Sequence, residues 1–302
     1  MRRLVAFLEL GRPLFLAGGF VLFGLGAAIA AATGHAIDWR RYLLGQAAVT
    51  AFQSMTHYAN DYFDFDADRA NTTATRWSGG SRVLPDGDLP RGVALAAALV
   101  LATIGIAVGG VLAVDAGVLA APTLALVLVL AWSYSAPPMR LCARGLGELD
   151  TAVVVTVLVP WLGFYLQAPD LRGGGLLALS IVSPALLQVA MLVAVEFPDA
   201  AADAATDKRT LVVRLGPARA ANLYATLVAL AYAWLPIAWL AGLPAHVVLA
   251  AAIPVPIAAW RIAAIADHAD RSAHERLTFF AVFLLVTTSA ATLAGWLIVT
   301  TG

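Results

Sequence analysis

The chain contains apolar runs that are long enough to cross a lipid bilayer. A spanning helix needs roughly 20 mostly apolar residues, and the sequence offers about nine such runs. Because hydrocarbon leaves backbone polar groups without solvent partners, each run is expected to form a helix. The expected spans are 13–33, 42–60, 93–114, 117–136, 149–168, 176–197, 220–240, 245–266 and 277–300. We therefore predict an all-α integral membrane protein with one domain over residues 1–302.

The basic residues of the loops predict the orientation of this protein. Lys and Arg accumulate on the cytoplasmic side of short connections, and here they gather before the first span and in loops 61–91, 137–147, 198–217 and 261–276. Only Arg40, Arg41 and Arg172 fall on the opposite side. We expect a multi-pass protein of the cell membrane, with the N-terminus and these loops cytoplasmic.

Charge balance and cysteine content give no sign of nucleic-acid binding, of disulfides or of a cysteine metal site. The 19 basic and 19 acidic residues cancel, which gives no sign of a nucleic-acid partner and leaves the lipid bilayer as the expected surroundings. Cys142 is the only cysteine, so the chain forms no internal disulfide and carries no cysteine pattern for a metal site.

Two acidic clusters lie in the expected cytoplasmic loops. The first is "NDYFDFDAD", with Asp61, Asp64 and Asp68 on one face of a continuing helix and Asp66 pointing elsewhere. The second is "DAAADAATD", with Asp199, Asp203 and Asp207 on one helical face. For any single Asp of these clusters, a position at a solvated loop end is as good an interpretation as a functional role. Two matched clusters, after the second and sixth spans, favour a functional site and predict two related four-helix halves followed by a ninth helix.

Paired carboxylate clusters at one membrane face suit Mg²⁺ and a diphosphate. Mg²⁺ keeps several waters, takes one or two carboxylates and completes its shell with phosphate oxygens. Nearby cationic side chains would neutralise the remaining charge; the basic residues available are Arg12, Arg82, Arg140, Lys208 and Arg209. Stabilising a departing diphosphate lowers the barrier to ionising an allylic C–O bond.

At this point the motifs resemble those of the UbiA superfamily of intramembrane prenyltransferases. "NDYFDFDAD" matches the pattern NDxxDxxxD, and "DAAAD" with the following "DKRTLVVRLG" matches the second motif. The resemblance covers nearly the whole chain. Residues 79–85, "GGSRVLP", and 134–149, "YSAPPMRLCARGLGEL", most resemble the menaquinone-pathway branch, which prenylates 1,4-dihydroxy-2-naphthoate.

The resemblance also implies a fold and a set of site residues. Helices would surround a central cavity that opens laterally to lipid, and loops 61–91 and 198–217 would cap it. One Mg²⁺ would be held by Asn60, Asp61, Asp64 and Asp68, and a second by Asp199 and Asp203. The diphosphate would contact Arg12, Arg140, Lys208 and Arg209, with Asn60 beside it.

These patterns predict Mg²⁺-dependent transfer of a polyprenyl group from an allylic diphosphate to an aromatic small molecule. The polar side chains expected on the acceptor side are His57, Tyr134 and Gln188, and no residue stands out as a general base. One alternative is a terpene cyclase of the same superfamily. A secondary transporter is another, although Lys208 and Arg209 beside the acids favour an enzyme.

The long loop 61–91 is expected to form a lid over the site. Loops of more than about 12 to 15 residues are commonly functional lids or disordered segments. Trp77, Val83 and Leu84 offer apolar surface to pack against the bundle, and Gly79 and Gly80 allow a hinge.

Overall fold

The computed structural model describes residues 2–265 and 271–301, and within these ranges the chain forms helices and no strand. The α-helices are α1 (Arg2–Leu10), α2 (Pro13–Ala32), α3 (Trp39–Phe63), α4 (Phe65–Ala70), α5 (Arg91–Ala113), α6 (Ala120–Ser133), α7 (Gly147–Thr151), α8 (Val159–Tyr165), α9 (Gly174–Glu196), α10 (Ala200–Ala205), α11 (Leu211–Leu215), α12 (Pro217–Leu240), α13 (Ala245–Ala251), α14 (Val255–Ala263) and α15 (Arg271–Thr301). A 3₁₀ turn, η1 (Leu141–Arg144), precedes α7, and a π-helix, η2 (Ala152–Leu158), joins α7 to α8.

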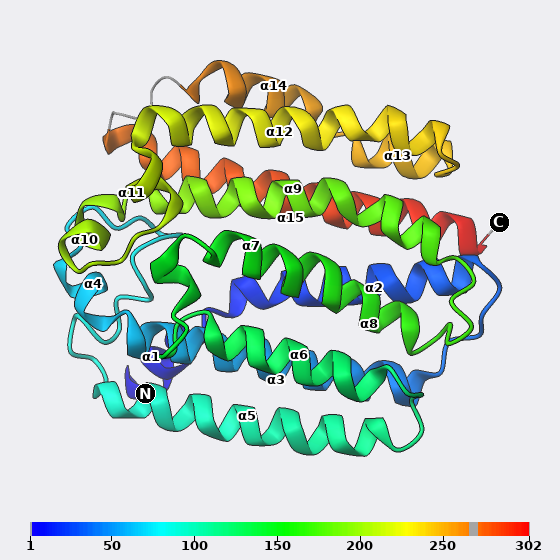
Figure 1. Ribbon diagram of the computed structural model, residues 1–302, viewed down its shortest axis with the longest axis horizontal. Helices are drawn as coiled ribbons and strands as arrows, with labels where there is room; N and C mark the ends of the chain where they lie inside the picture. The colour runs from blue at the N-terminus through cyan, green and yellow to red at the C-terminus, as the bar shows by residue number, and fades with distance from the viewer. Residues whose placement is uncertain (1, 266–270, 302) are drawn as a thin grey trace.

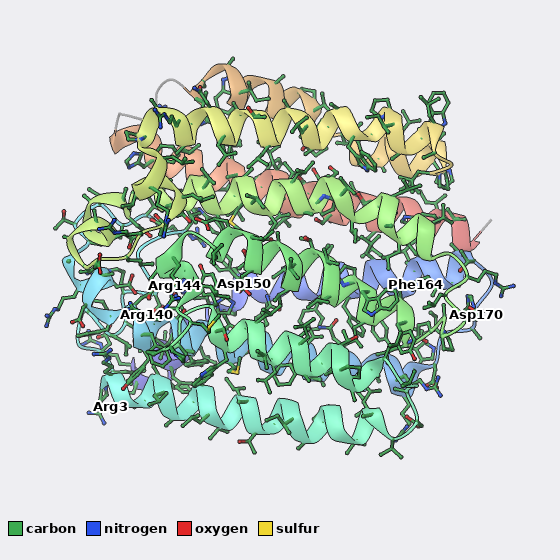
Figure 2. All side chains as sticks on the ribbon, in the orientation of Figure 1. Arg3, Arg140, Arg144, Asp150, Phe164 and Asp170 are labelled. Atoms are coloured by element: carbon green, nitrogen blue, oxygen red, sulfur yellow. The ribbon has the colours of Figure 1, made fainter. Side chains whose placement is uncertain are left out.

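The long helices run side by side along one direction, as Figure 1 shows. The short helices α1, α4, α10 and α11 gather at one end of this bundle, together with the N-terminus. The C-terminus lies at the other end. Figure 2 places Arg140 and Arg144 at the end with the short helices and Asp170 at the opposite end.

Each predicted span falls on helical structure, which confirms the all-α membrane class. Seven segments are long and apolar enough to cross a membrane by length and composition among the described residues. The other two predicted spans correspond to α3, which is rich in polar residues, and to α6, which has 14 residues. The count of nine spans therefore stays a prediction.

The expected helix 245–266 is broken in the structure. It divides into α13 and α14 around Pro254, since proline removes a backbone donor and crowds the preceding turn. Its expected end, Ala266, lies outside the described residues.

Helices α2 and α8 cross at direct backbone contact. A Cβ atom built on Gly26 would overlap the carbonyl oxygen of Pro160, and one built on Gly163 would overlap that of Phe23. Small residues allow membrane helices to approach this closely. The crossing therefore fixes α2, which begins beside Arg12, relative to the helix that leads back to α7.

The loop between α4 and α5 packs against the end of the helix bundle. Val83 and Leu84 are buried in one apolar cluster with Leu10 and Met55. Trp77 lies with its ring centroid 5.8 Å from that of Phe15. The loop therefore covers the end of the bundle that carries both acidic motifs.

Candidate active site

A cavity of about 270 Å³ lies between the long helices beneath this loop. Its lining is polar at the end near the short helices, where it includes Arg12, Asn60, Asp64, Asp68, Asp199, Asp203 and Lys208. Apolar side chains line the rest, among them Leu22, Val49, Phe52, Val154 and Leu285. Such a cavity suits a molecule with a charged head and an apolar tail.

The first acidic motif places two of its carboxylates in the cavity wall. Asp64 is buried at the end of α3, and its Oδ2 accepts a hydrogen bond from Nδ2 of Asn60 at 3.0 Å. Asp68, on α4, is also buried and lines the cavity. Asp66 is exposed and pairs with Arg69 at 3.5 Å. The expectation that Asp66 points away from Asp64 and Asp68 is confirmed.

Asp61 is placed differently from these two residues. Its Oδ1 pairs with the guanidinium of Arg12, and its Oδ2 accepts from the backbone N–H of Ser81 at 3.1 Å and from the Ser81 hydroxyl. It is buried and is not among the described residues that line the cavity. Asp61 therefore ties α3 to Arg12 and to the covering loop.

The second motif is held by the same loop. Oδ1 of Asp199 accepts from Nδ2 of Asn71 at 2.8 Å, and its Oδ2 accepts from the backbone N–H of Gly79 at 2.9 Å. The hydroxyl of Thr73 donates to the carbonyl of Pro198. The covering loop thus contacts both acidic motifs, through Asp61 and through Asp199.

The expectation that Asp207 shares a helical face with Asp199 and Asp203 is wrong. Helix α10 ends at Ala205, and Asp207 adopts a left-handed backbone conformation with φ of 58°. The N–H of Lys208 then donates to the carbonyl of Asp203 at 2.8 Å, which is the Schellman pattern of a helix end. This turn sends Asp207 outward and directs Lys208 back toward the acids.

Lys208 links the two acidic motifs. Its Nζ lies 2.8 Å from Oδ2 of Asp64 and 3.5 Å from Oδ1 of Asp203. Burial by itself lowers the pKa of Lys208, but these carboxylates outweigh burial and hold the pKa well above its usual value. The side chain therefore stays charged between the motifs.

The carboxylates around Lys208 lie where additional positive charge would be favourable. Burial raises the pKa of Asp203 to about 7 and also raises the pKa values of Asp68 and Asp199. Among the described residues, no three His, Cys, Asp or Glu groups form a ready-made metal cage. Carboxylate oxygens nevertheless fit a hard divalent cation, which takes few protein ligands and uses water and phosphate for the others.

Two predicted diphosphate ligands lie outside the cavity. The side chain of Arg209 is 67% exposed and faces Asp207 at 3.4 Å. Arg140 is half-buried at the start of η1, and neither arginine is among the described residues that line the cavity. Arg82, also considered from sequence, donates to the carbonyl of Asp68 and pairs with Asp86.

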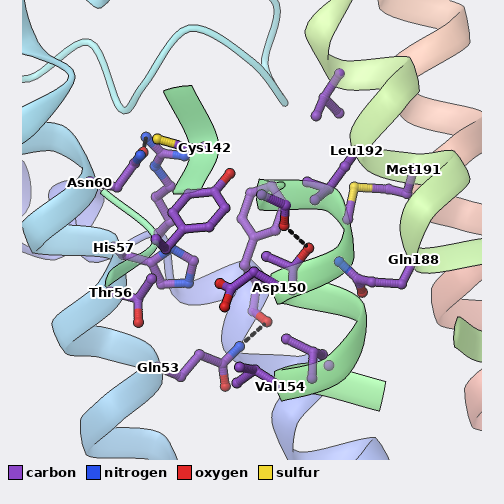
Figure 3. Close-up of a pocket in the computed structure, with 18 of the residues that line it drawn as sticks. Gln53, Thr56, His57, Asn60, Cys142, Asp150, Val154, Gln188, Met191 and Leu192 are labelled. Atoms are coloured by element: carbon purple, nitrogen blue, oxygen red, sulfur yellow. Dashed lines mark hydrogen bonds between the residues drawn. The ribbon is translucent and has the colours of Figure 1, made fainter. Parts of the chain in front are cut away.

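The predicted acceptor-side residues His57, Tyr134 and Gln188 all line the cavity. Figure 3 shows His57 on α3 and Gln188 on α9, on either side of Asp150. Sequence reasoning missed Asp150, which is 7% exposed. An acidic residue at the start of an apolar span was the available signal.

A pair of glutamates supports the segment that carries Lys208. Glu148 lies on α7 and Glu196 lies at the end of α9. Oε1 of Glu148 accepts from the N–H of Leu211 at 2.9 Å, and Oε2 of Glu196 accepts from that of Val212 at 3.2 Å. The start of α11 is thereby anchored to α7 and α9.

Comparison with known proteins finds a matching family model and related prenyltransferase sequences. The model of the UbiA prenyltransferase family matches residues 20–286. The chain is 35% identical over 219 residues to the 1,4-dihydroxy-2-naphthoate octaprenyltransferase of Mycobacterium tuberculosis. The aligned segment covers 70% of this chain and 69% of that protein.

Solved structures share the fold at lower identity. A UbiA homolog from Archaeoglobus fulgidus bound to GPP and Mg²⁺ gives a TM-score of 0.63 at 14% identity, covering 98% of this chain and 100% of that one. The apo structure of a UbiA homolog from Aeropyrum pernix gives a TM-score of 0.65 at 19% identity. The match covers 92% of this chain and 97% of that one.

Proposed function

Since the chain belongs to the UbiA prenyltransferase family and is a prenyltransferase, we propose that it transfers a polyprenyl group from an allylic diphosphate to an aromatic acceptor with Mg²⁺. The observation that carries the proposal is the junction of the two acidic motifs at Lys208, at the polar end of an otherwise apolar cavity. Family membership favours this enzyme over the secondary transporter.

The polar end of the cavity would bind the diphosphate. Bound Mg²⁺, held by Asp64, Asp68, Asp199 and Asp203, would supply positive charge to the phosphate oxygens as negative charge develops on them. Lys208 and Arg12 would donate charge-assisted hydrogen bonds to the same group. The apolar lining would hold the isoprenoid and keep water away from the reacting carbon.

The proposal gives Asp61 a role other than metal binding. It gives Arg140 and Arg209 no contact with the diphosphate. Asp61, unlike Asp199, is not among the described residues that line the cavity, and it contacts Arg12 and Ser81, so we assign it to orienting Arg12 and anchoring the covering loop. The exposed guanidinium of Arg209 and the position of Arg140 outside the cavity favour Lys208 and Arg12 as the diphosphate contacts.

We further propose 1,4-dihydroxy-2-naphthoate as the acceptor, supported by the relative from M. tuberculosis. Purified protein, Mg²⁺ and radiolabelled polyprenyl diphosphate would be incubated with this compound, with hydroxybenzoates or with no acceptor, and the products identified by mass. We expect a prenylated naphthoate product that is lost when EDTA removes the metal. Cyclic hydrocarbon or alcohol formed at a rate independent of every acceptor would contradict the transferase and support the cyclase.

The loop charges predict which membrane face carries the site. Cysteine at the exposed position Ala36 should react with an impermeant thiol reagent added outside cells, and cysteine at the exposed position Thr72 should react only after the membrane is opened. The native Cys142 is buried, so its background labelling is low. The reverse pattern would place both motifs on the external face and refute the proposed cytoplasmic orientation.

A further inference from the structure

Three polar side chains from different helices line the cavity beside its apolar part. His57 comes from α3, Asp150 from α7 and Gln188 from α9, and all three line the cavity. Figure 3 shows the side chains of His57 and Gln188 directed toward Asp150 from opposite sides. Asp150 is 7% exposed and Gln188 is 4% exposed.

Two polar atoms of this group have no hydrogen-bond partner. They are Oδ1 of Asp150 and Nε2 of His57, both buried, and the part of the chain that the structure describes provides no partner for either atom. Buried polar atoms are nearly always hydrogen-bonded, so each exception calls for an explanation. Both residues line the same cavity, and one ligand bound there could therefore contact both of them.

His57 lies about one helical turn from the diphosphate end. His57 precedes Asn60 by three residues on α3, a rise of about 4.5 Å along the helix axis. Asp150 forms no ion pair with any described residue, in contrast to Asp64 and Asp203, which both contact Lys208. A carboxylate without a cation would repel a phosphate and would attract a hydroxyl group that can donate a proton.

We propose that Asp150 accepts the proton of a ring hydroxyl on the aromatic acceptor, while His57 and Gln188 position that ring. The proposal rests on the proposed transferase function and adds to it the group that activates the nucleophile. A carboxylate within hydrogen-bond reach of the hydroxyl would act as a general base.

The step balances in protons and electrons. The O–H bond breaks as its proton moves to Asp150, and the ring π electrons form a C–C bond to the allylic carbon. The allylic C–O bond breaks with its electron pair on the diphosphate. The resulting ring ketone regains aromaticity when the hydrogen on the attacked carbon leaves as a proton and Asp150 returns its own proton to the ring oxygen. One proton is released overall.

The test compares wild type with Asp150→Asn, which keeps the size of the side chain and removes its basic function. Transfer to 1,4-dihydroxy-2-naphthoate should fall about 100-fold. The KM for the prenyl diphosphate should be unchanged, because Asp150 is proposed to contact the acceptor and not the donor. Asp88→Asn is the matched control, because Asp88 is exposed on the loop before α5.

Ring-fluorinated naphthoates with more acidic hydroxyls separate proton transfer from a structural role. The deficit of Asp150→Asn should shrink as the hydroxyl becomes more acidic, because a more acidic hydroxyl depends less on a base. Should Asp150→Asn not accumulate as folded protein, His57→Gln and Gln188→Leu give a second test: each should raise the KM for the acceptor and leave the KM for the donor unchanged.

Two results would overturn the proposal alone: Asp150→Asn transfers at nearly the wild-type rate, or its deficit is equal for every acceptor in the series. Unchanged acceptor KM values in both His57→Gln and Gln188→Leu would remove the positioning roles. A wild-type protein that prenylates no aromatic compound would instead overturn the transferase function itself, and that result is read in the wild-type arm before any variant is compared.

Discussion

Replacing Asp64 with asparagine is expected to lower the rate of prenyl transfer by about three orders of magnitude, at the upper end of what a single transition-state contact supplies. Oδ2 of Asp64 accepts hydrogen bonds from Asn60 at 3.0 Å and from Lys208 at 2.8 Å. Asparagine keeps the size of the side chain but removes the charge that would bind the metal and hold Lys208. The measurement is the initial rate of product formation in lipid nanodiscs with saturating Mg²⁺.

The matched control for Asp64→Asn is Asp66→Asn. Asp66 lies two residues away, is exposed and pairs only with Arg69 among the described residues. Its removal should leave the rate close to that of wild type, because exposed ion pairs contribute little. Equal losses in both variants would refute the assignment of Asp64, and not Asp66, to the site. The melting temperature of each variant separates lost activity from lost folding.

Replacing Gly80 with alanine is expected to lower the rate about 100-fold, the scale that follows a displacement of about 1 Å in a catalytic group. A Cβ atom on Gly80 would overlap Oδ2 of Asp68. The backbone of Gly80 has φ of 74°, which alanine also disfavours. Alanine would therefore push the carboxylate of Asp68 out of the cavity wall and loosen the covering loop.

Gly87→Ala separates these two effects. Gly87 lies on the same loop with φ of 81°, and nothing lies within 4 Å of the position of its Cβ. It carries a similar backbone cost without the contact to Asp68. We expect a lower melting temperature and a near-normal rate for Gly87→Ala. Similar rate losses in both variants would show that backbone conformation, and not the Asp68 contact, causes the defect.

The sequence was sufficient to predict the helical membrane class, because long apolar runs permit few other structures. It also predicted that Asp66 points away from Asp64 and Asp68, because the periodicity of a helix continues almost unbroken through the first motif. The same periodicity failed in the second motif. The Schellman turn at Asp207 depends on a left-handed residue, and aspartate tolerates that conformation without marking it in the sequence.

Other parts of the site depend on contacts between distant segments. The bonds from Asn71 and Gly79 to Asp199 join residues more than 100 positions apart, and no local pattern encodes them. Arg140 and Arg209 share charge and loop location with Lys208, so composition could not separate them. Asp150 was overlooked because the polar residues that line the same cavity, His57 and Gln188, come from helices α3 and α9 and not from its own helix.

The π-helix η2 allows residues to be inserted or deleted between α7 and α8, which would change the side chains that line the cavity. Its backbone hydrogen bonds close one residue later than those of an α-helix, so the segment 152–158 accommodates additional chain between α7 and α8. Helix α8 is fixed by the contact of Gly163 with Phe23, whereas α7 carries Asp150 into the cavity. Losing one codon within this segment would turn α7 about its axis and leave the crossing of α2 and α8 intact. A single deletion here would thus change the side chains that α7 presents to an acceptor, and it would also move Glu148 away from Leu211.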